Sequence, residues 1–289
     1  MNLNLQFLSE NDLPVLYQTF MEAFADYVQD ASHVTETNFT NRAIKNGVDY
    51  ETSVGAFDQG KMVGFTAVAH DNFCGGYAAF DAFTGIIKPY RGQGLAKAMF
   101  EFVVPKLKAN GVERFYLEVI QSNEPAVRAY QKAGFTITRE FDAFEIHFEN
   151  AHLDQVADKS VEIRTISKSD LAQVADFFDW QPSWENSLAS IQRIPDKVLI
   201  LGAHVQNKLV GFLVYYPLLK WILNLAVQKS YRRQKIGTTL LAHLKDQISG
   251  QVPTTKIINV EHTDKQMIEF LKTVGFEFFL NQYEMKLDL

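Results

Sequence analysis

The pattern of apolar and polar positions along the chain follows the two periods of regular secondary structure. Alternation with a period of two predicts strands, and apolar side chains three or four positions apart predict helices. By these rules the first half contains strands over 3–8, 52–57, 62–69, 83–87 and 115–120, two closing strands over 135–148, and helices over 13–30, 36–46, 95–110 and 123–132, with a loop over 70–76. This mixture of strands and helices predicts an α/β fold.

The same order of elements returns in the second half, so the chain contains an internal repeat. Corresponding segments lie 147 residues apart up to the first hairpin and 141 residues apart after it. The matching pairs are Lys61-Met-Val-Gly-Phe65 with Lys208-Leu-Val-Gly-Phe212, Tyr90-Arg91 with Tyr231-Arg232, and Gly134-Phe135 with Gly275-Phe276. Two constant offsets predict a duplicated α/β unit. We therefore expect two domains, over 1–150 and 160–289, joined by a linker.

Composition narrows the class of protein. Hydrophobic residues make up 47% of the 289 positions, which is enough to fill the cores of two ordinary domains. The net charge of −6 argues against a general nucleic-acid binder. The single cysteine, Cys74, excludes an internal disulfide and suits a reducing compartment. Because no apolar stretch approaches the ~20 residues of a membrane span, and the N-terminus lacks the features of a signal peptide, we expect a cytoplasmic protein. We expect no membrane or nucleic-acid partner, no metal site, and a monomer or homodimer.

One stretch of the first half carries a candidate ligand site. Pro89 ends the strand over 83–87, and Arg91-Gly-Gln-Gly-Leu-Ala96 leads directly into the helix over 95–110. Glycines let the backbone come close to a ligand, and the first N–H groups of a helix have no partners inside it. A diphosphate suits such a site, with Arg91 adding positive charge. The alternative is an ordinary strand–turn–helix that contains glycines.

The order of elements, with this loop after the fourth strand, resembles the GNAT superfamily of N-acetyltransferases. Residues 91–96 match the family's coenzyme A loop, Q/R-x-x-G-x-G/A, and residues 123–135 are similar to its second motif, N…A…Y…x-G-F. The resemblance implies two GNAT-like domains, each a mixed, largely antiparallel sheet flanked by helices. It further implies acetyl-CoA as co-substrate, no metal, and an amine of a small molecule or peptide as acceptor.

The resemblance also implies which residues contact the cofactor. The fourth and fifth strands would separate, and the pantetheine arm would lie along the backbone of Gly85, Ile86 and Ile87. The diphosphate would lie on the glycine loop, formed by Arg91, Gly92, Gln93, Gly94, Leu95 and Ala96. Asn123 would contact the cofactor, cap its helix, or do both.

Acetyl transfer to an amine also needs groups that move protons. Tyr130 falls at the family's position for the general acid, although a helix aromatic at this spacing is also suited to the core. For the general base the candidates are Asp81, Glu118 and water, and either carboxylate could instead be structural. A β-bulge expected near Gly85 leaves open the face of the sheet that each carboxylate occupies.

Acidic residues of the first helix add one further candidate. Glu22, Asp26 and Asp30 are four positions apart and would share one helix face. They could form a wall that attracts an amine, or they could be a solvated face.

The second half departs from the motif at its functional positions. Arg233 and Lys235 replace the two loop glycines, Leu271 replaces Tyr130, and Asp264 replaces Asn123. We expect this half to keep the fold without the chemistry, although its cations could still attract a phosphate. The predicted function is therefore direct acetyl transfer in a ternary complex by the first half. The alternative is a non-catalytic acyl-CoA-binding or regulatory protein, and a purely structural role suits the second half better than the whole chain.

Overall fold

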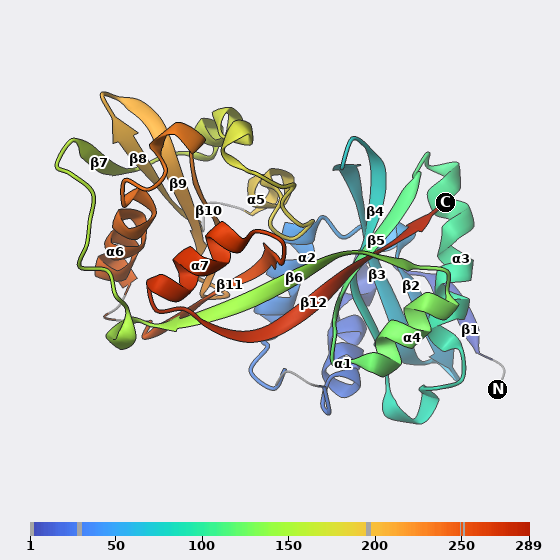
Figure 1. Cartoon of the computed structure of the whole chain (residues 1–289). Helices are drawn as coiled ribbons and strands as arrows, with labels where there is room; N and C mark the ends of the chain where they lie inside the picture. Colours follow the sequence, from blue (N-terminus) through green and yellow to red (C-terminus); the bar gives the residue numbers. More distant parts are fainter. Residues whose placement is uncertain (1–2, 28–30, 195–197, 249, 251) are drawn as a thin grey trace. The chain divides into compact units, whose positions relative to one another are not determined.

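The computed structural model describes residues 3–27, 31–194, 198–248, 250 and 252–289, and the chain forms two compact units (Figure 1). The first unit comprises Met1–Arg139 and Tyr283–Leu289, and the second comprises Glu140–Gln282. This division differs from the expected one into 1–150 and 160–289. The reason is that two long closing strands, β6 (Thr136–His147) and β12 (Glu277–Asp288), each begin in one unit and end in the other.

The first unit is a seven-membered sheet covered by helices. Its strands follow the order β1-β2-β3-β4-β5-β12-β6. The strands that belong wholly to it are β1 (Asn4–Phe7), β2 (Val54–Asp58), β3 (Lys61–Phe73), β4 (Gly76–Ile86) and β5 (Arg114–Ile120), and its helices are α1 (Leu13–Ala23), α2 (Glu36–Asn46), α3 (Leu95–Ala109) and α4 (Glu124–Lys132). Apolar side chains of α3 and of the sheet form one buried cluster, which includes Met99, Phe100, Phe115 and Leu117.

The last residues of the chain complete this first sheet. Met285 of β12 is fully buried in the cluster under α3, and the N–H of Leu289 donates to Glu113 at 2.9 Å. Glu284 is also buried and accepts hydrogen bonds from Arg139 at 2.6 and 3.0 Å. The last strand of the second repeat therefore helps to fill the core of the first unit.

Three predicted elements of the first unit differ from the structure. The two closing strands expected over 135–148 form one continuous strand, β6. The first helix ends at Ala23 rather than near residue 30, with Phe24 as its C-cap. The expected loop over 70–76 is instead the tip of a long hairpin, in which β3 reaches Phe73 and β4 starts at Gly76. The polar residues there did not look like a strand, but tertiary hydrogen bonds hold them in one: His70 bonds to Asp49 at 2.8 Å and to Tyr77 at 2.6 Å.

The second unit repeats the first with shorter helices at its start. Its sheet follows the order β6-β11-β10-β9-β8-β7, with β12 on the other side of β6. The elements are β7 (Val161–Thr165), α5 (Leu188–Arg193), β8 (Leu199–Val205), β9 (Lys208–Tyr216), β10 (Trp221–Val227), α6 (Ile236–Ile248), β11 (Thr254–Glu261) and α7 (Lys265–Thr273). The offset of 141 residues carries the start of α3 onto the start of α6 and both ends of α4 onto those of α7. The internal repeat in the sequence is thus a repeat in structure.

Candidate functional site

The glycine loop of the first unit has the backbone shape that an anion site needs. Gly92 and Gly94 have φ values of 74° and 80°, and Gly94 is the N-cap of α3. A Cβ added at either glycine would meet no atom within 4 Å, so backbone conformation rather than crowding favours glycine here. The N–H groups of the first turn of α3 have no acceptors inside the helix and therefore suit a phosphate. The loop therefore has the backbone features that a diphosphate site needs.

Arg91 anchors this loop to the rest of the unit. Its guanidinium donates to both oxygens of Asp26 at 2.8 and 3.0 Å, to the carbonyl of Ala23 at 2.7 Å, and to the carbonyl of Ile86 at 2.9 Å. The hydrogen bond from Arg91 lowers the pKa of Asp26 below its usual value. Arg91 is thus a structural tie between the end of α1, the end of β4 and the loop. The guanidinium of Arg91 is ion-paired with Asp26 and is not free to bind a phosphate. A role of Arg91 in cofactor binding therefore remains a prediction for its backbone N–H alone.

Of the two alternatives for the acidic residues of the first helix, the described carboxylates do not support a wall that attracts an amine. Asp26 lies beyond the end of α1 and is ion-paired with Arg91, and Glu22 is ion-paired with Lys61 at 2.9 Å. Asp30 lies outside the described residues. Both described carboxylates serve local ion pairs.

The fourth and fifth strands of the first unit separate where the resemblance expects a gap. They pair in parallel only from Ala78 with Arg114 to Asp81 with Leu117. A bulge lies at Ala82 rather than near Gly85, because Phe83 pairs with Ala67 while Asp81 pairs with Val68. Beyond this point one edge of β4 has no strand beside it.

The backbone N–H and C=O groups at the end of β4 point in directions that only some of the predicted cofactor contacts allow. The N–H of Ile87 donates to Val63 at 3.0 Å and is therefore directed toward β3. Backbone groups of successive residues in an antiparallel strand point to opposite edges, so the N–H of Gly85 also faces β3. The groups on the gap side are those of Thr84 and Ile86, and Arg91 reaches the Ile86 carbonyl from there. Of the three predicted residues, Ile86 has the backbone orientation to pair with a pantetheine arm.

Asp81 is held in a buried environment that changes its acidity. Its side chain is on β4 and only 6% exposed, and both carboxylate oxygens lie within hydrogen-bond distance of Thr84 Oγ1, at 2.8 and 2.9 Å. Burial raises the pKa of Asp81 to about 7, although the hydrogen bonds from Thr84 and from the Phe83 backbone oppose the shift. A carboxylate with this pKa can accept and return a proton near neutrality.

Tyr130 lies on α4, close enough to Asp81 for the two to influence each other. Its ring makes edge contacts with Phe100 and Phe135, at centroid distances of 5.8 and 6.1 Å. Burial raises the pKa of Tyr130 well above 10, and the nearby Asp81 and Tyr27 raise it further. The phenol is therefore neutral and carries its proton at physiological pH. The structure thus brings together two of the three predicted proton-transfer residues.

Glu118 occupies the other face of the sheet. Phe115, Leu117 and Val119 of β5 all belong to the core cluster under α3, so strand alternation turns Glu118 away from it. Ala79, which precedes Asp81 by two positions on β4, belongs to that same cluster. Asp81 and Glu118 are therefore on opposite faces, a point that the sequence left open.

Asn123 caps α4, and a residue that the sequence did not single out binds it. Asn123 Oδ1 accepts from the N–H of Ala126 at 3.3 Å. The Tyr27 side chain hydrogen-bonds Asn123, which opposes the rise that burial causes in the pKa of Tyr27. In the sequence, Tyr27 occupies an apolar position at helical spacing, and this pattern gives no sign of the hydrogen bond. The second unit repeats the arrangement, because Trp180 Nε1 donates to Asp264 at 2.7 Å and Asp264 caps α7.

The loop of the second unit keeps its shape without its glycines. Arg233 and Lys235 have φ values of 63° each, in the same left-handed region as Gly92 and Gly94. Arg232 anchors the loop as Arg91 does, through Asp179, the carbonyl of Phe177 at 2.9 Å and that of Val227 at 3.0 Å. Left-handed backbone costs a non-glycine residue roughly 1–2 kcal/mol. The loop of the second unit therefore keeps this geometry at a conformational cost that glycine would avoid.

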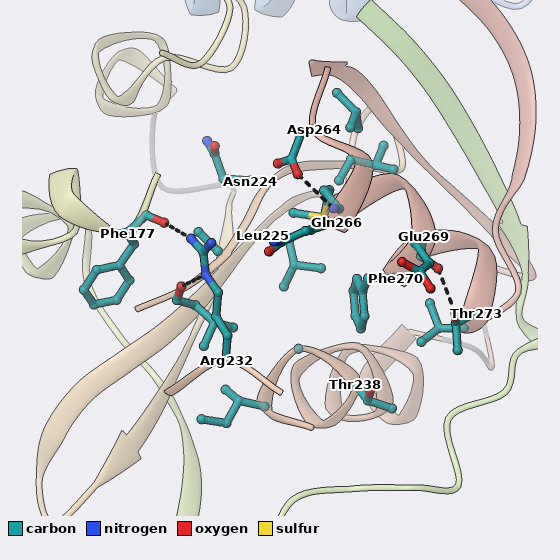
Figure 2. Close-up of a pocket in the computed structure, with 18 of the residues that line it drawn as sticks. Phe177, Asn224, Leu225, Arg232, Thr238, Asp264, Gln266, Glu269, Phe270 and Thr273 are labelled. Atoms are coloured by element: carbon teal, nitrogen blue, oxygen red, sulfur yellow. Dashed lines mark hydrogen bonds between the residues drawn. The ribbon is translucent and has the colours of Figure 1, made fainter. Parts of the chain in front are cut away.

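A cavity of about 630 Å³ lies in the second unit, between the end of β10, the start of α6 and α7 (Figure 2). It opens where β10 and β11 part, after pairing only at Trp221 and Ile222. Apolar side chains form much of its wall, and Figure 2 shows Phe270 of α7 and Arg232 among the residues that surround it. Ile222 and Leu271 stand at the positions of Asp81 and Tyr130, so this unit has the cavity without those two proton-transfer groups.

Among the residues that the structure describes, no group of three or more His, Cys, Asp or Glu could hold a metal ion. No described helix is both long and apolar enough to cross a membrane. Cys74 is exposed at the tip of the β3–β4 hairpin.

Comparison with known proteins identifies the family of both halves. The sequence model of the Acetyltransferase (GNAT) family matches residues 13–135 and 164–276. The chain is 33% identical over 81 residues to YdgE of Bacillus subtilis, an uncharacterized N-acetyltransferase, covering 28% of this chain and 52% of that one. It is 34% identical over 61 residues to mycothiol acetyltransferase of Corynebacterium glutamicum, covering 21% of each. The chain thus aligns with about half or less of the length of these curated relatives.

A solved structure shows the same tandem arrangement. A tandem GNAT protein from the clavulanic acid biosynthesis pathway superposes with a TM-score of 0.75, covering 99% of this chain and 98% of that one at 13% identity. The predicted fold, two GNAT-like α/β domains in tandem, is confirmed. Since the family model matches both halves of the repeat, the chain belongs to the Acetyltransferase (GNAT) family.

Proposed function

We propose that this protein transfers the acetyl group of acetyl-CoA to an amine, and that the first unit carries the reaction. The observation that carries the proposal is that Asp81 and Tyr130 lie on one face of the first sheet. Ala79, two positions before Asp81 on β4, belongs to the buried cluster against which Tyr130 of α4 packs, and Asp81 and Tyr130 interact electrostatically. The second unit has Ile222 and Leu271 at these positions. At these two pairs of equivalent positions, only the first unit therefore has side chains that can transfer a proton.

The first unit would hold the cofactor mainly through its backbone. The loop from Gly92 to Ala96 and the first turn of α3 offer N–H groups to a diphosphate. The gap-facing N–H of Ile86 would bind and orient the pantetheine arm, and Asn123 remains a further candidate contact. When bound, acetyl-CoA supplies the acetyl group as a reactive thioester.

Asp81 and Tyr130 would divide the proton transfers between them. Asp81, with a pKa of about 7, takes a proton at a carboxylate oxygen as the acceptor amine reacts. Tyr130 holds a proton at Oη and donates it to the leaving group. Glu118, on the other face of the sheet, and water remain alternative bases. Because only ionised Asp81 accepts a proton, kcat/KM should rise with pH through about 7.

The proposed acceptor is an amine of a small molecule or a peptide. One relative is named as a mycothiol acetyltransferase, but it matches over 21% of this chain and does not define the substrate here. The carboxylates that could have attracted a polyamine, Glu22 and Asp26, are engaged in ion pairs. The overall charge of −6 is consistent with cationic acceptors and with the cytoplasmic protein, monomeric or homodimeric, that we propose.

An acetyl-CoA thiol-release assay over a panel of amines tests this proposal. The wild-type protein should release thiol with at least one amine, and Asp81→Asn should lose the rise in activity near pH 7. Gly94→Glu would put a negative charge at the proposed diphosphate site and should weaken acetyl-CoA binding. Gly94→Asn is its neutral control, since asparagine tolerates left-handed backbone. Unchanged acetyl-CoA affinity and activity in Gly94→Glu would remove the site from this loop.

The cavity favours a second candidate function, a non-catalytic acyl-CoA site in the second unit. Arg233 and Lys235 lie at its mouth, beside the start of α6, and both also suit a diphosphate. At its wall, Asn186 Oδ1 is buried and no described residue hydrogen-bonds it, so it can accept from a bound ligand. The unit would then bind a ligand without transforming it.

Calorimetric titration with acetyl-CoA separates the two candidates. Two sites per chain would support binding by both units, and Lys235→Glu should then abolish one site while activity persists. One site that is lost in Gly94→Glu and kept in Lys235→Glu would restrict cofactor binding to the first unit.

A further inference from the structure

Three side chains of the first unit form a chain of hydrogen bonds that ends at Asp81. Thr66 Oγ1 lies 2.9 Å from Thr84 Oγ1, which in turn lies 2.8 and 2.9 Å from the two carboxylate oxygens of Asp81. Thr66 is on β3, directly opposite Thr84 in the register of the sheet. Thr66 is fully buried and Asp81 nearly so. Asp81 accepts from the Thr84 hydroxyl and from the backbone N–H of Phe83.

The bulge at Ala82 makes this contact possible. In a regular strand, residues three positions apart point to opposite faces, so the side chains of Asp81 and Thr84 would be separated by the sheet. The extra residue between Asp81 and Phe83 shifts the alternation by one. Asp81 and Thr84 therefore share a face.

The number of hydrogens fixes the direction of the chain. A threonine hydroxyl carries one hydrogen, and an ionised carboxylate can only accept. When Asp81 is ionised, Thr84 donates to it, and the oxygen of Thr84 is left to accept from Thr66. The two hydroxyls then stabilise the charged form of Asp81 in a site where burial disfavours it.

We propose that Thr84, oriented by Thr66, is a positioning residue that holds Asp81 ready to accept the proton of the acceptor amine. The inference rests on the proposed function of the first unit. The titratable group that interacts with Asp81 is Tyr130 from α4. Tyr27, from the segment after α1, acts on Tyr130, and Arg42 of α2 acts on Tyr27. Phe83 contributes a backbone N–H.

Carbon-13 NMR titration of the Asp81 carboxyl in the full-length protein tests the inference directly. In Thr84→Val, which keeps the shape and removes the hydroxyl, the titration midpoint should rise by about one pH unit, the size expected for a lost hydrogen bond to a charged group. Thr84→Ser should titrate as the wild type does. Thr66→Val should shift the midpoint in the same direction by less, because Thr84 keeps its hydrogen but loses its orientation.

The pH profile of acetyl transfer supplies the second readout. With the midpoint one unit higher, the ionised fraction of Asp81 at pH 7 falls from about one half to about one tenth. Activity of Thr84→Val at pH 7 should therefore fall about fivefold and recover by pH 9, which a general loss of folding would not produce.

The outcomes separate the two proposals. An Asp81 midpoint that does not move in Thr84→Val overturns the positioning role, whatever the activity. A midpoint that moves in a protein whose Asp81→Asn variant is fully active supports the hydrogen-bond chain and removes Asp81 from catalysis. Should Thr84→Val fail to fold, the midpoint in Thr66→Val decides: a rise supports the inference and no change overturns it.

Discussion

The two loops at residues 91–96 and 232–237 differ in sequence and agree in shape. Each is fixed by an arginine, Arg91 or Arg232, that ties an aspartate and two carbonyls of its own unit. Both place two left-handed residues before a helix, although one loop uses glycines and the other uses Arg233 and Lys235. The comparison teaches that the anchored arginine and the helix start define this loop, while glycine only lowers its conformational cost.

The sites beside the two loops differ in the chemistry of their side chains. The first unit has Asp81 and Tyr130 close together, whereas the second has apolar residues at both positions and a large cavity. The proposed function therefore assigns ligand binding and proton transfer to different residues of one duplicated fold. This is the physical basis for assigning chemistry to one half.

The largest effect should come from Tyr130→Phe. Removing a general acid typically costs 10²–10⁴-fold in rate, so we expect kcat to fall by about that factor with little change in acetyl-CoA affinity. Steady-state kinetics with the best amine of the panel measures it. Circular dichroism should show an unchanged fold, since the ring and its contacts with Phe100 remain. A loss of less than about threefold would assign Tyr130 to the core and end the contrast with Leu271.

Asp81→Asn should change stability in a pH-dependent way. The folded pKa of about 7 lies above the unfolded value of about 3.9, so the folded state binds more protons between these values and wild-type stability falls as pH rises through them. Asparagine does not titrate. The variant should therefore gain about 2–4 kcal/mol relative to wild type between pH 4 and pH 8. Denaturant unfolding at several pH values measures this, and a pH-independent difference would contradict the assigned environment of Asp81.

Matched changes at the two arginines should separate structure from function. Arg91→Gln and Arg232→Gln each remove the ion pair to an aspartate, and both should lower the Tm of the protein. Only Arg91→Gln should affect activity, with KM for acetyl-CoA rising about tenfold, because it releases the proposed acetyl-CoA-binding loop. Equal KM changes in both variants would indicate that the two loops act together.

The smallest effect should come from Lys235→Gly. Glycine relieves the left-handed strain of about 1–2 kcal/mol but gives the unfolded chain more entropy, so the net change should be a stabilisation of about 1 kcal/mol or less. Thermal unfolding measures it, with no loss of activity. A clear destabilisation would mean that the Lys235 side chain makes a contact essential to the second unit.

Local patterns in the sequence determined much of this protein. Hydrophobic periodicity and capping residues determined most strands and helices, since these signals depend on neighbours along the chain. The repeat offset of 141 residues carries α4 onto α7, and the family motifs located the glycine loop, Asn123 and Tyr130. The fold class followed from these signals together.

Only the tertiary structure decided how distant segments combine. The sequence could not show that β12 begins in the second unit and ends in the first. The alternation of side chains along a strand does not identify the strand that pairs with it. The bulge at Ala82 places Thr84 beside Asp81, which simple strand alternation would not predict. The hydrogen bonds of Arg91 with Asp26 and of Tyr27 with Asn123 join segments that are far apart in the sequence. The burial that raises the pKa of Asp81 depends on everything packed around it. Sequence periodicity reports which face a residue occupies, and the fold decides what it meets there.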